Sequence, residues 1–153
     1  MADRVLGLPD KNGPFKYDVY LGCGVLDLTS AVNGLREMLE RRDILCFPKY
    51  DPAHSQQGTK SAIIEGVARS RKCLLYVSPS FIEDKWYKME VAEVVNKAKR
   101  FSRDMVVVLK HPQLASVPSE LSEYGVLNVH DDDTLKNPEF LNGLADALKK
   151  GMC

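Results

Sequence analysis

Short apolar runs alternate along the chain with longer segments in which apolar residues recur every three or four positions. The runs occupy residues 17–21, 44–47, 72–77, 105–109 and 126–129. Runs of this length that are separated by amphipathic segments predict β-strands joined by helices. The run at 105–109 is almost entirely apolar, as expected of a central strand in a parallel sheet, which is buried on both faces.

The amphipathic segments predict four helices. The first begins at Thr29 or Ser30, either of which can cap it, and ends near Glu40. The second follows Gly58, and its predicted apolar face consists of Ile63, Ile64, Val67 and Ala68. The last two cover about 83–100 and 138–150, with Pro138 at the first helical position of the final one. Residues 114–124 contain two prolines and are predicted to be irregular or a short helix.

Five strands that alternate with helices fit a three-layer α/β sandwich with a parallel sheet. We predict one domain over residues 1–153, with its core at about 15–150. The commonest order of five such strands is 2-1-3-4-5, and ligands then bind outside the carboxyl ends of the first and third strands. The loops that follow these strands, 22–29 and 78–85, would border that crevice.

One carboxylate is predicted to lie next to this crevice. At about 100° per residue, the third helix has one apolar stripe that faces the sheet, formed by Tyr87, Val91, Val94, Val95 and Ala98. Glu90 flanks the stripe one turn after Trp86, so we expect a partly desolvated carboxylate beside an indole. The alternative is a solvated helix residue that pairs with Lys97 or Lys60, because structural carboxylates are common.

Composition and charge exclude several classes of function. Lys+Arg and Asp+Glu number 21 each, so the formal net charge is zero. The chain therefore has no excess of positive charge with which to bind nucleic acid or an anionic membrane. The apolar runs are too short to span a bilayer, and the first residues do not resemble a signal peptide. The four cysteines are scattered without a C-x-x-C pair, which argues against a zinc site and against a disulfide framework. Because disulfides are rare in reducing compartments, this pattern favours a cytoplasmic location.

Other site chemistries have weaker support. Gly22-Cys23-Gly24 is a lone G-x-G, and the chain contains no G-x-x-x-x-G-K-[ST] phosphate loop. The three aspartates at 131–133 lack the glycine and the distant glutamate of a calcium loop, so we interpret them as a solvated turn. The three histidines are isolated and have no metal-ligand spacing. We expect neither a metal site nor a bound cofactor.

Four motifs in order resemble those of a Toll/interleukin receptor (TIR) domain over nearly the whole chain. Tyr17-Asp18-Val19-Tyr20-Leu21 is similar to the first box, Y-D-A-F-I-S-Y. Residues 74–81 followed by Trp86 and Glu90 are similar to the segment L-S-x-x-F/Y…W-C-x-x-E. Residues 109–121 resemble the L-x-P…I-P-x-x-L region, and 140–148 match the last box, F-W-x-x-L-x-x-A-L, with Leu141 in place of Trp.

The resemblance implies a flavodoxin-like fold and self-association through the loop after the second strand, the BB loop, here Pro48 to Gly58. It also implies NAD as a substrate, because a subset of the family cleaves NAD with the glutamate of the W-x-x-x-E segment, which falls on Glu90. The residues expected to contact NAD are Trp86, Gly22, Cys23, Gly24, Tyr50, Asp51 and Ser78.

Two functions therefore stay open at this point. The first is a TIR domain that hydrolyses or cyclises NAD. The second is a silent adaptor that acts through TIR–TIR contacts in innate immune signalling. This chain has Gly24-Val25 where related NAD-cleaving domains place arginines, and its BB loop has Tyr50-Asp51-Pro52 and then Gly58 where R-D-x-x-P-G is usual.

Overall fold

In the computed structural model, residues 15–48, 58–131 and 133–150 are described. They form one parallel five-stranded sheet in the order β2-β1-β3-β4-β5, which confirms the predicted order. The strands are β1 (Tyr17–Gly22), β2 (Cys46–Pro48), β3 (Ser70–Val77), β4 (Val106–Lys110) and β5 (Gly125–Asn128).

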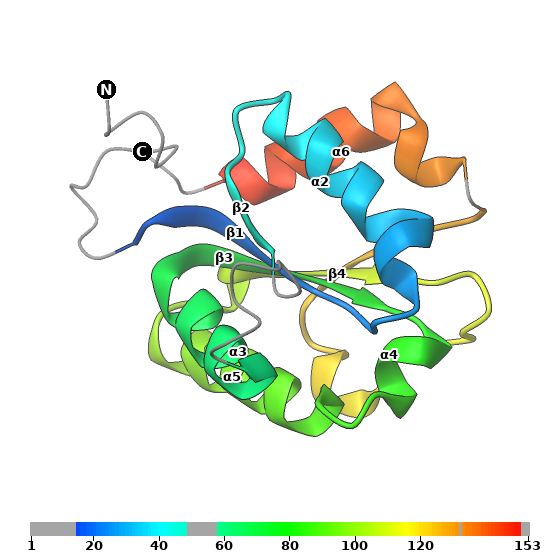
Figure 1. The fold of residues 1–153 in the computed structure, drawn as a ribbon. Helices are drawn as coiled ribbons and strands as arrows, with labels where there is room; N and C mark the ends of the chain where they lie inside the picture. Colours follow the sequence, from blue (N-terminus) through cyan, green and yellow to red (C-terminus); the bar gives the residue numbers. More distant parts are fainter. Residues whose placement is uncertain (1–14, 49–57, 132, 151–153) are drawn as a thin grey trace.

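Helices cover both faces of the sheet and produce the three layers seen in Figure 1. On one face lie α2 (Asn33–Glu40) and α6 (Pro138–Lys149), and on the other lie α3 (Gly58–Arg69) and α5 (Tyr87–Arg100). Short 3₁₀ turns complete the connections at Arg103–Met105, Ser119–Leu121 and Thr134–Lys136.

The strands supply side chains to two separate apolar cores. In β1, Val19 and Leu21 belong to the core beneath α2 and α6, whereas Tyr20 belongs to the core beneath α3 and α5. In β3, Leu74 likewise belongs to the core beneath α2 and α6, and Leu75 belongs to the core beneath α3 and α5. Because both faces are buried, the central strands have apolar residues at successive positions, which is the pattern that predicted them.

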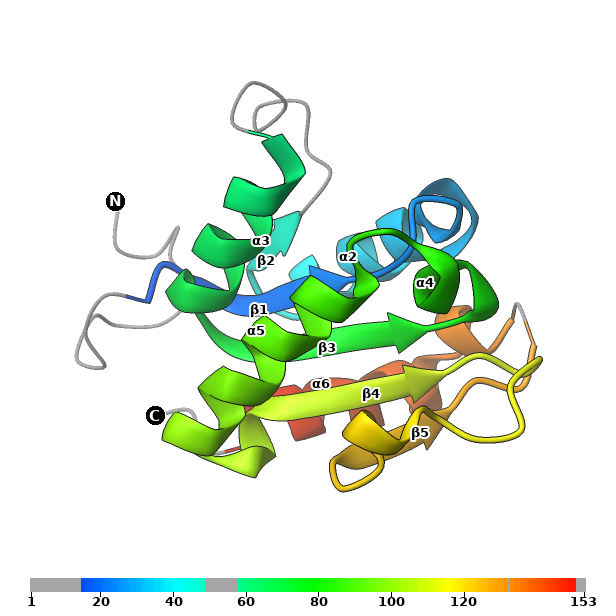
Figure 2. The same cartoon turned by 90° about the horizontal axis from the view of Figure 1, so that it is seen from below.

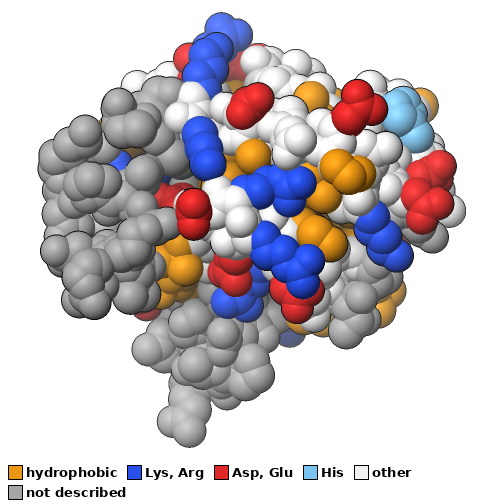
Figure 3. All heavy atoms as spheres, turned by 90° about the horizontal axis from the view of Figure 1, so that it is seen from above, with side chains coloured by type: hydrophobic (Ala, Val, Ile, Leu, Met, Phe, Trp, Pro, Cys, Tyr) orange, Lys and Arg blue, Asp and Glu red, His pale blue; other side chains and the backbone are white. Residues whose placement is uncertain are grey.

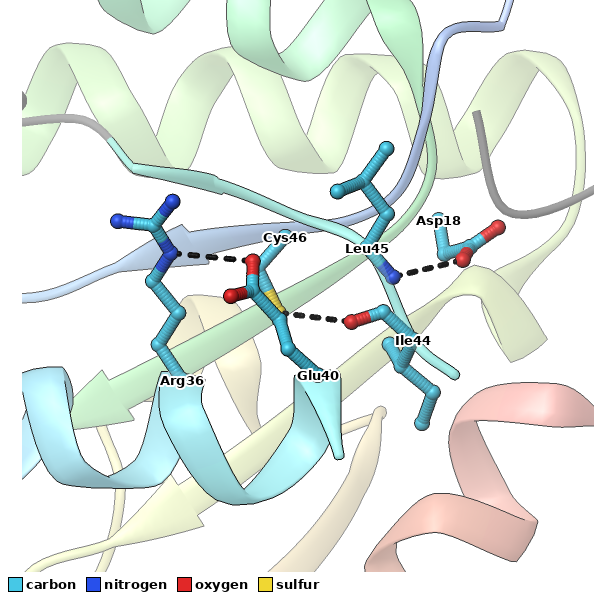
Figure 4. Close-up of polar contacts among 6 residues, drawn as sticks. All are labelled: Asp18, Arg36, Glu40, Ile44, Leu45 and Cys46. Carbon is cyan, nitrogen blue, oxygen red and sulfur yellow. Dashed lines mark hydrogen bonds and ion pairs between the residues drawn. The ribbon is translucent and has the colours of Figure 1, made fainter. Parts of the chain in front are cut away.

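The edge strand β2 is fixed by polar contacts just before it begins. A carboxylate oxygen of Asp18, a buried residue of β1, accepts a hydrogen bond from the backbone N–H of Leu45 at 2.8 Å. The thiol of Cys46 lies 3.7 Å from the carbonyl oxygen of Ile44 and donates to it (Figure 4). The Asp18–Leu45 bond holds the chain beside β1, while only three residues of β2 form the strand itself.

The first helix begins earlier than predicted. A π-helical turn, Leu28–Val32, precedes α2, and Asp27 stands at its start. Thr29 and Ser30 therefore lie inside the turn, and the prediction that one of them caps the helix is wrong. Asp27 makes no capping hydrogen bond because its carboxylate accepts one from the hydroxyl of Ser78.

The helix predicted at 83–100 begins later, as α5, and a separate short helix, α4 (Pro79–Glu83), precedes it. Ser78 caps α4, since its hydroxyl oxygen accepts a hydrogen bond from the N–H of Phe81 at 3.1 Å. Asp84 has an extended backbone and ends α4, and its carboxylate accepts a bond from the N–H of Trp86 at 2.8 Å. The break turns the chain before α5 begins, so Glu90 lies in the first turn of its own helix.

The face that α3 presents to the sheet is only partly the predicted one. Ile63 is buried as predicted, but Ile64 is 42% exposed. Gly66 faces the sheet instead, because the aromatic rings of Tyr20 and Phe47 fill the space beneath it. A Cβ at this position would lie 2.6 Å from atoms of both rings. The rings thus decide which residues of α3 are buried.

The outer surface has charges of both signs. Figure 3 shows Lys and Arg side chains interspersed with Asp and Glu over the face formed by α2 and α6, in accord with the zero net charge. Among the described residues, no helix is both long and apolar enough to cross a membrane.

Gly66→Ala should destabilise the fold because its methyl group would overlap the rings of Tyr20 and Phe47. Overpacking of this kind lowers the free energy of unfolding by about 1–3 kcal/mol. Gly143→Ala in α6 is the matched control, since nothing lies within 4 Å of the added Cβ. Helix propensity should make that variant more stable by about 0.5–1 kcal/mol. Urea unfolding measures both changes, and equal stabilities would contradict the prediction.

Candidate functional site

The candidate site lies where β1 and β3, which are adjacent and parallel, reach their carboxyl ends. Figure 2 views the sheet from the side of α3 and α5, with α4 beside the end of β3. In sheets of this topology, the strand order changes direction between these two strands, and ligands bind outside their carboxyl ends.

Glu90 reaches this edge of the sheet from the first turn of α5. Its backbone N–H donates to the carbonyl oxygen of Trp86 at 2.9 Å, so the helix holds its backbone. The side chain is 0% exposed. Glu90 is thus buried more completely than predicted, and the alternative that it is an ordinary solvated residue is wrong.

The described contacts of Glu90 include a short hydrogen bond from Tyr20. The phenol donates to Oε2 with an oxygen–oxygen distance of 2.5 Å, and both side chains are 0% exposed. This distance is in the range typical of a hydroxyl that donates to an ionised carboxylate. Burial raises the pKa of Tyr20 well above its ordinary value, and the charge of Glu90 and the hydrogen bond raise it further. Tyr20 is therefore a protonated donor at neutral pH.

Gly22 provides the space for the Glu90 carboxylate. A Cβ on this glycine would lie 2.5 Å from Oε2 of Glu90 and 2.5 Å from Cδ2 of Leu75. No real Cβ approaches another atom so closely, so any side chain here would displace its neighbours. The carboxylate lies against the last residue of β1 because that residue is glycine.

The loop after β1 is in direct contact with the loop after β3. The hydroxyl of Ser78 donates to the carboxylate of Asp27, and both residues are buried. A Cβ on Gly24 would lie 2.6 Å from Oγ of Ser80 and 2.7 Å from the backbone nitrogen of Phe81. The two predicted borders of the crevice therefore touch each other.

The structure brings together only some of the residues predicted to contact NAD. Glu90 and Gly22 are in contact, and Ser78 and Gly24 join the two loops nearby. Cys23 belongs to the core on the opposite face of the sheet.

Trp86 is half-buried at the start of α5, and the Nζ of Lys85 lies 5.6 Å from the centroid of its ring. Tyr50 and Asp51, with the remainder of the BB loop over 49–57, lie outside the described residues.

Sequence reasoning missed Tyr20 and Asp27 as members of this site. The apolar strand pattern and the first-box motif both contain Tyr20, but neither predicts a role for its hydroxyl group. One signal was available, because residues two apart in a strand face the same side, which pairs Tyr20 with Gly22. The partnership of Asp27 with Ser78 had no such local signal, since it depends on how two loops meet.

Thiol and metal chemistry have no support among the described residues. Cys23, Cys46 and Cys73 are buried thiols that form no disulfide, and burial raises the pKa of Cys73 to about 12. A thiol with such a pKa is not an effective nucleophile at neutral pH. Within the same part of the chain, no group of three His, Cys, Asp or Glu residues is placed to hold a metal ion.

Comparison with solved structures supports the fold assignment. The TIR domain of the Toll-related receptor TRR-2 from Hydra magnipapillata superposes with a TM-score of 0.66 and 19% identity, over 87% of this chain and 98% of that one. A metazoan TIR-STING receptor from C. gigas, solved in complex with 2′,3′-cGAMP, superposes with a TM-score of 0.71 and 18% identity. That alignment covers 92% of this chain and 42% of the receptor chain.

Sequence comparison identifies the family. A search of curated proteins finds no match. The family model described as "TIR domain" matches residues 16–124, which is more than half of the chain and includes β1 to β4, α5 and Glu90. This chain therefore belongs to the TIR domain family.

Proposed function

We propose that this domain associates with other TIR domains and that the associated form cleaves the nicotinamide–ribose bond of NAD, with Glu90 as the catalytic residue. The observation that carries the proposal is the position of the Glu90 carboxylate. It lies against Gly22 at the carboxyl ends of β1 and β3, where sheets of this topology bind their ligands.

One carboxylate is sufficient for this chemistry. When the bond between C1′ of the ribose and the nicotinamide nitrogen breaks, its electron pair goes to a cationic ring, which leaves as a neutral base. No general acid is needed for that step. The ribosyl group acquires oxocarbenium character, and a nearby anion lowers the energy of that transition state. Water or a group of the same nucleotide then adds to C1′, with loss of a proton, to form ADP-ribose or a cyclic product.

Assembly would account for the burial of the catalytic group. Since Glu90 is 0% exposed in the single chain, NAD can reach it only after neighbouring groups move. Enzymes commonly complete their sites through such conformational steps. We propose that contacts between TIR domains through the BB loop, Pro48 to Gly58, drive this change. Backbone groups of Gly22, Cys23 and Gly24 and the side chains of Ser78, Trp86, Tyr50 and Asp51 would then contact the dinucleotide.

A second candidate function is a silent adaptor that only assembles with other TIR domains. The full burial of Glu90 favours it, because a buried carboxylate can be structural. The buried thiols of the described residues form no disulfide, and this fits the reducing cytoplasm, which we infer as the compartment of either function.

Glu90→Gln should strongly slow nicotinamide release and leave the fold intact. Concentrated protein is incubated with NAD and a crowding agent, and nicotinamide is followed by chromatography. Loss of the anion that stabilises the transition state should slow release by about 10²–10³-fold. Glu93→Gln is the matched control, since Glu93 is on the same helix and half-buried and should retain activity. If the wild-type protein assembles but releases no nicotinamide, the adaptor function is the correct one.

Gly22→Ala should also lower nicotinamide release, because its methyl group would displace the Glu90 carboxylate. We expect a decrease of at least about 10-fold, together with a loss of about 1–3 kcal/mol in stability from overpacking. Gly125→Ala in β5 is the control, since no atom lies within 4 Å of its added Cβ. A Gly22→Ala enzyme with wild-type activity would show that the position of this carboxylate is unimportant.

A further inference from the structure

We infer that Tyr20 is the positioning residue of this site: its phenol holds the Glu90 carboxylate in place from within the core of the sheet. The inference rests on the proposed function for its catalytic meaning. Its structural part, a hydrogen bond between two residues 70 positions apart, can be tested without any activity.

The ring of Tyr20 is itself firmly held. Tyr20 lies in the middle of β1 and is paired in register with Phe47 of β2 and Cys73 of β3. Its ring centroid is 6.0 Å from that of Phe47, and Gly66 of α3 packs directly against the ring. A fully buried ring between two neighbouring strands and a helix presents its hydroxyl group in one position.

The hydroxyl has one chemical role at this position. The raised pKa of Tyr20 keeps the proton on the phenol, so the group donates to Oε2 of Glu90 rather than competing with it as an anion. A hydrogen bond of 2.5 Å restricts the torsions of the glutamate side chain. Gly22 limits the carboxylate from another direction, so a strand glycine and a strand hydroxyl together define its place.

Such restraint matters for catalysis by a single carboxylate. A catalytic group must be held close to its productive geometry by neighbours that are themselves locked, and a displacement of about 1 Å can cost about 10²-fold in rate. The glutamate side chain has three rotatable bonds, and the helix fixes only its backbone. Both partners come from rigid elements, β1 and α5, so movement of the surface loops can uncover Glu90 while this bond persists.

The opposite interpretation is that the phenol sequesters Glu90 from NAD. The bond would then have to break in each turnover, and its removal would raise the rate. The two interpretations therefore predict changes of opposite sign for the same variant. Tyr20→Phe removes a single oxygen atom, and phenylalanine stands at the matching place in the first-box pattern, so the aromatic packing should survive.

Tyr20→Phe is the decisive variant. At equal protein concentration, we expect kcat for nicotinamide release to fall about 10- to 100-fold with KM unchanged, because the carboxylate is misplaced and substrate binding is not affected. Tyr17→Phe on the same strand is the matched control and should keep the wild-type kcat, since Tyr17 is half-buried and packs edge-on against Phe47. Tyr20→Phe combined with Glu90→Gln should be no slower than Glu90→Gln alone, since both changes act through one carboxylate.

Proton NMR supplies the readout that is independent of activity. The hydroxyl proton of Tyr20 should exchange slowly and appear as a resolved downfield resonance in the wild type. It should be absent in Tyr20→Phe, retained in Tyr17→Phe and shifted upfield in Glu90→Gln, where a neutral amide replaces the carboxylate.

The outcomes separate this inference from the proposed function. A wild-type protein that shows the resonance but releases no nicotinamide would refute NAD cleavage, and with it any catalytic role for Tyr20, while confirming the contact. An active wild type whose Tyr20→Phe variant has an unchanged or increased kcat would refute the positioning role alone. Absence of the resonance in the wild type would refute the contact itself.

Discussion

The hydrogen bond between Tyr20 and Glu90 joins the centre of the sheet to α5, and the packing around it follows from that contact. An isolated carboxylate in a protein core costs several kcal/mol. A hydrogen bond to a charged group offsets about 1.5–3 kcal/mol of such a cost. The phenol can reach the carboxylate only if nothing intervenes, and two glycines make this possible. Gly22 leaves room for the carboxylate, and Gly66 leaves room for the ring beneath α3.

Several buried polar side chains have different kinds of hydrogen-bond partner at the two ends of the sheet. At the carboxyl ends of the strands, hydroxyl groups donate to carboxylates, in the pairs Tyr20–Glu90 and Ser78–Asp27. At the amino ends, buried ammonium groups donate to backbone carbonyls. Lys97 donates to Val67 and Ser70 where α3 meets β3.

Lys72 donates to the carbonyl oxygens of Asp104 at 3.3 Å and Ala147 at 3.0 Å. Burial lowers the pKa of both lysines. These two lysines therefore fasten chain connections, whereas the carboxylates of Glu90 and Asp27 lie at the edge where a ligand would bind.

The local pattern of the chain was sufficient for the architecture. The apolar runs predicted all five strands within a few residues, and the alternation of strand and helix predicted the order of the sheet. The motif around Trp86 and Glu90 also predicted that the carboxylate lies near the carboxyl ends of β1 and β3, and the structure has it against Gly22, the last residue of β1. These features depend on neighbours in sequence, or on rules that hold for every sheet of this kind. The cap of the first helix was harder to predict, because the carboxylate of Asp27 accepts a hydrogen bond from Ser78, which lies in another loop.

The sequence by itself therefore determined the elements, their order and the residue type delivered to the candidate site. Only the tertiary structure decided that Glu90 is fully buried, that Tyr20 is its donor and that α3 turns Gly66 rather than Ile64 toward the sheet. Helical phase placed Glu90 at the edge of a stripe, but burial depends on what lies opposite that edge. The group that lies opposite comes from a strand 70 residues earlier, and close packing between elements, not local periodicity, sets such contacts.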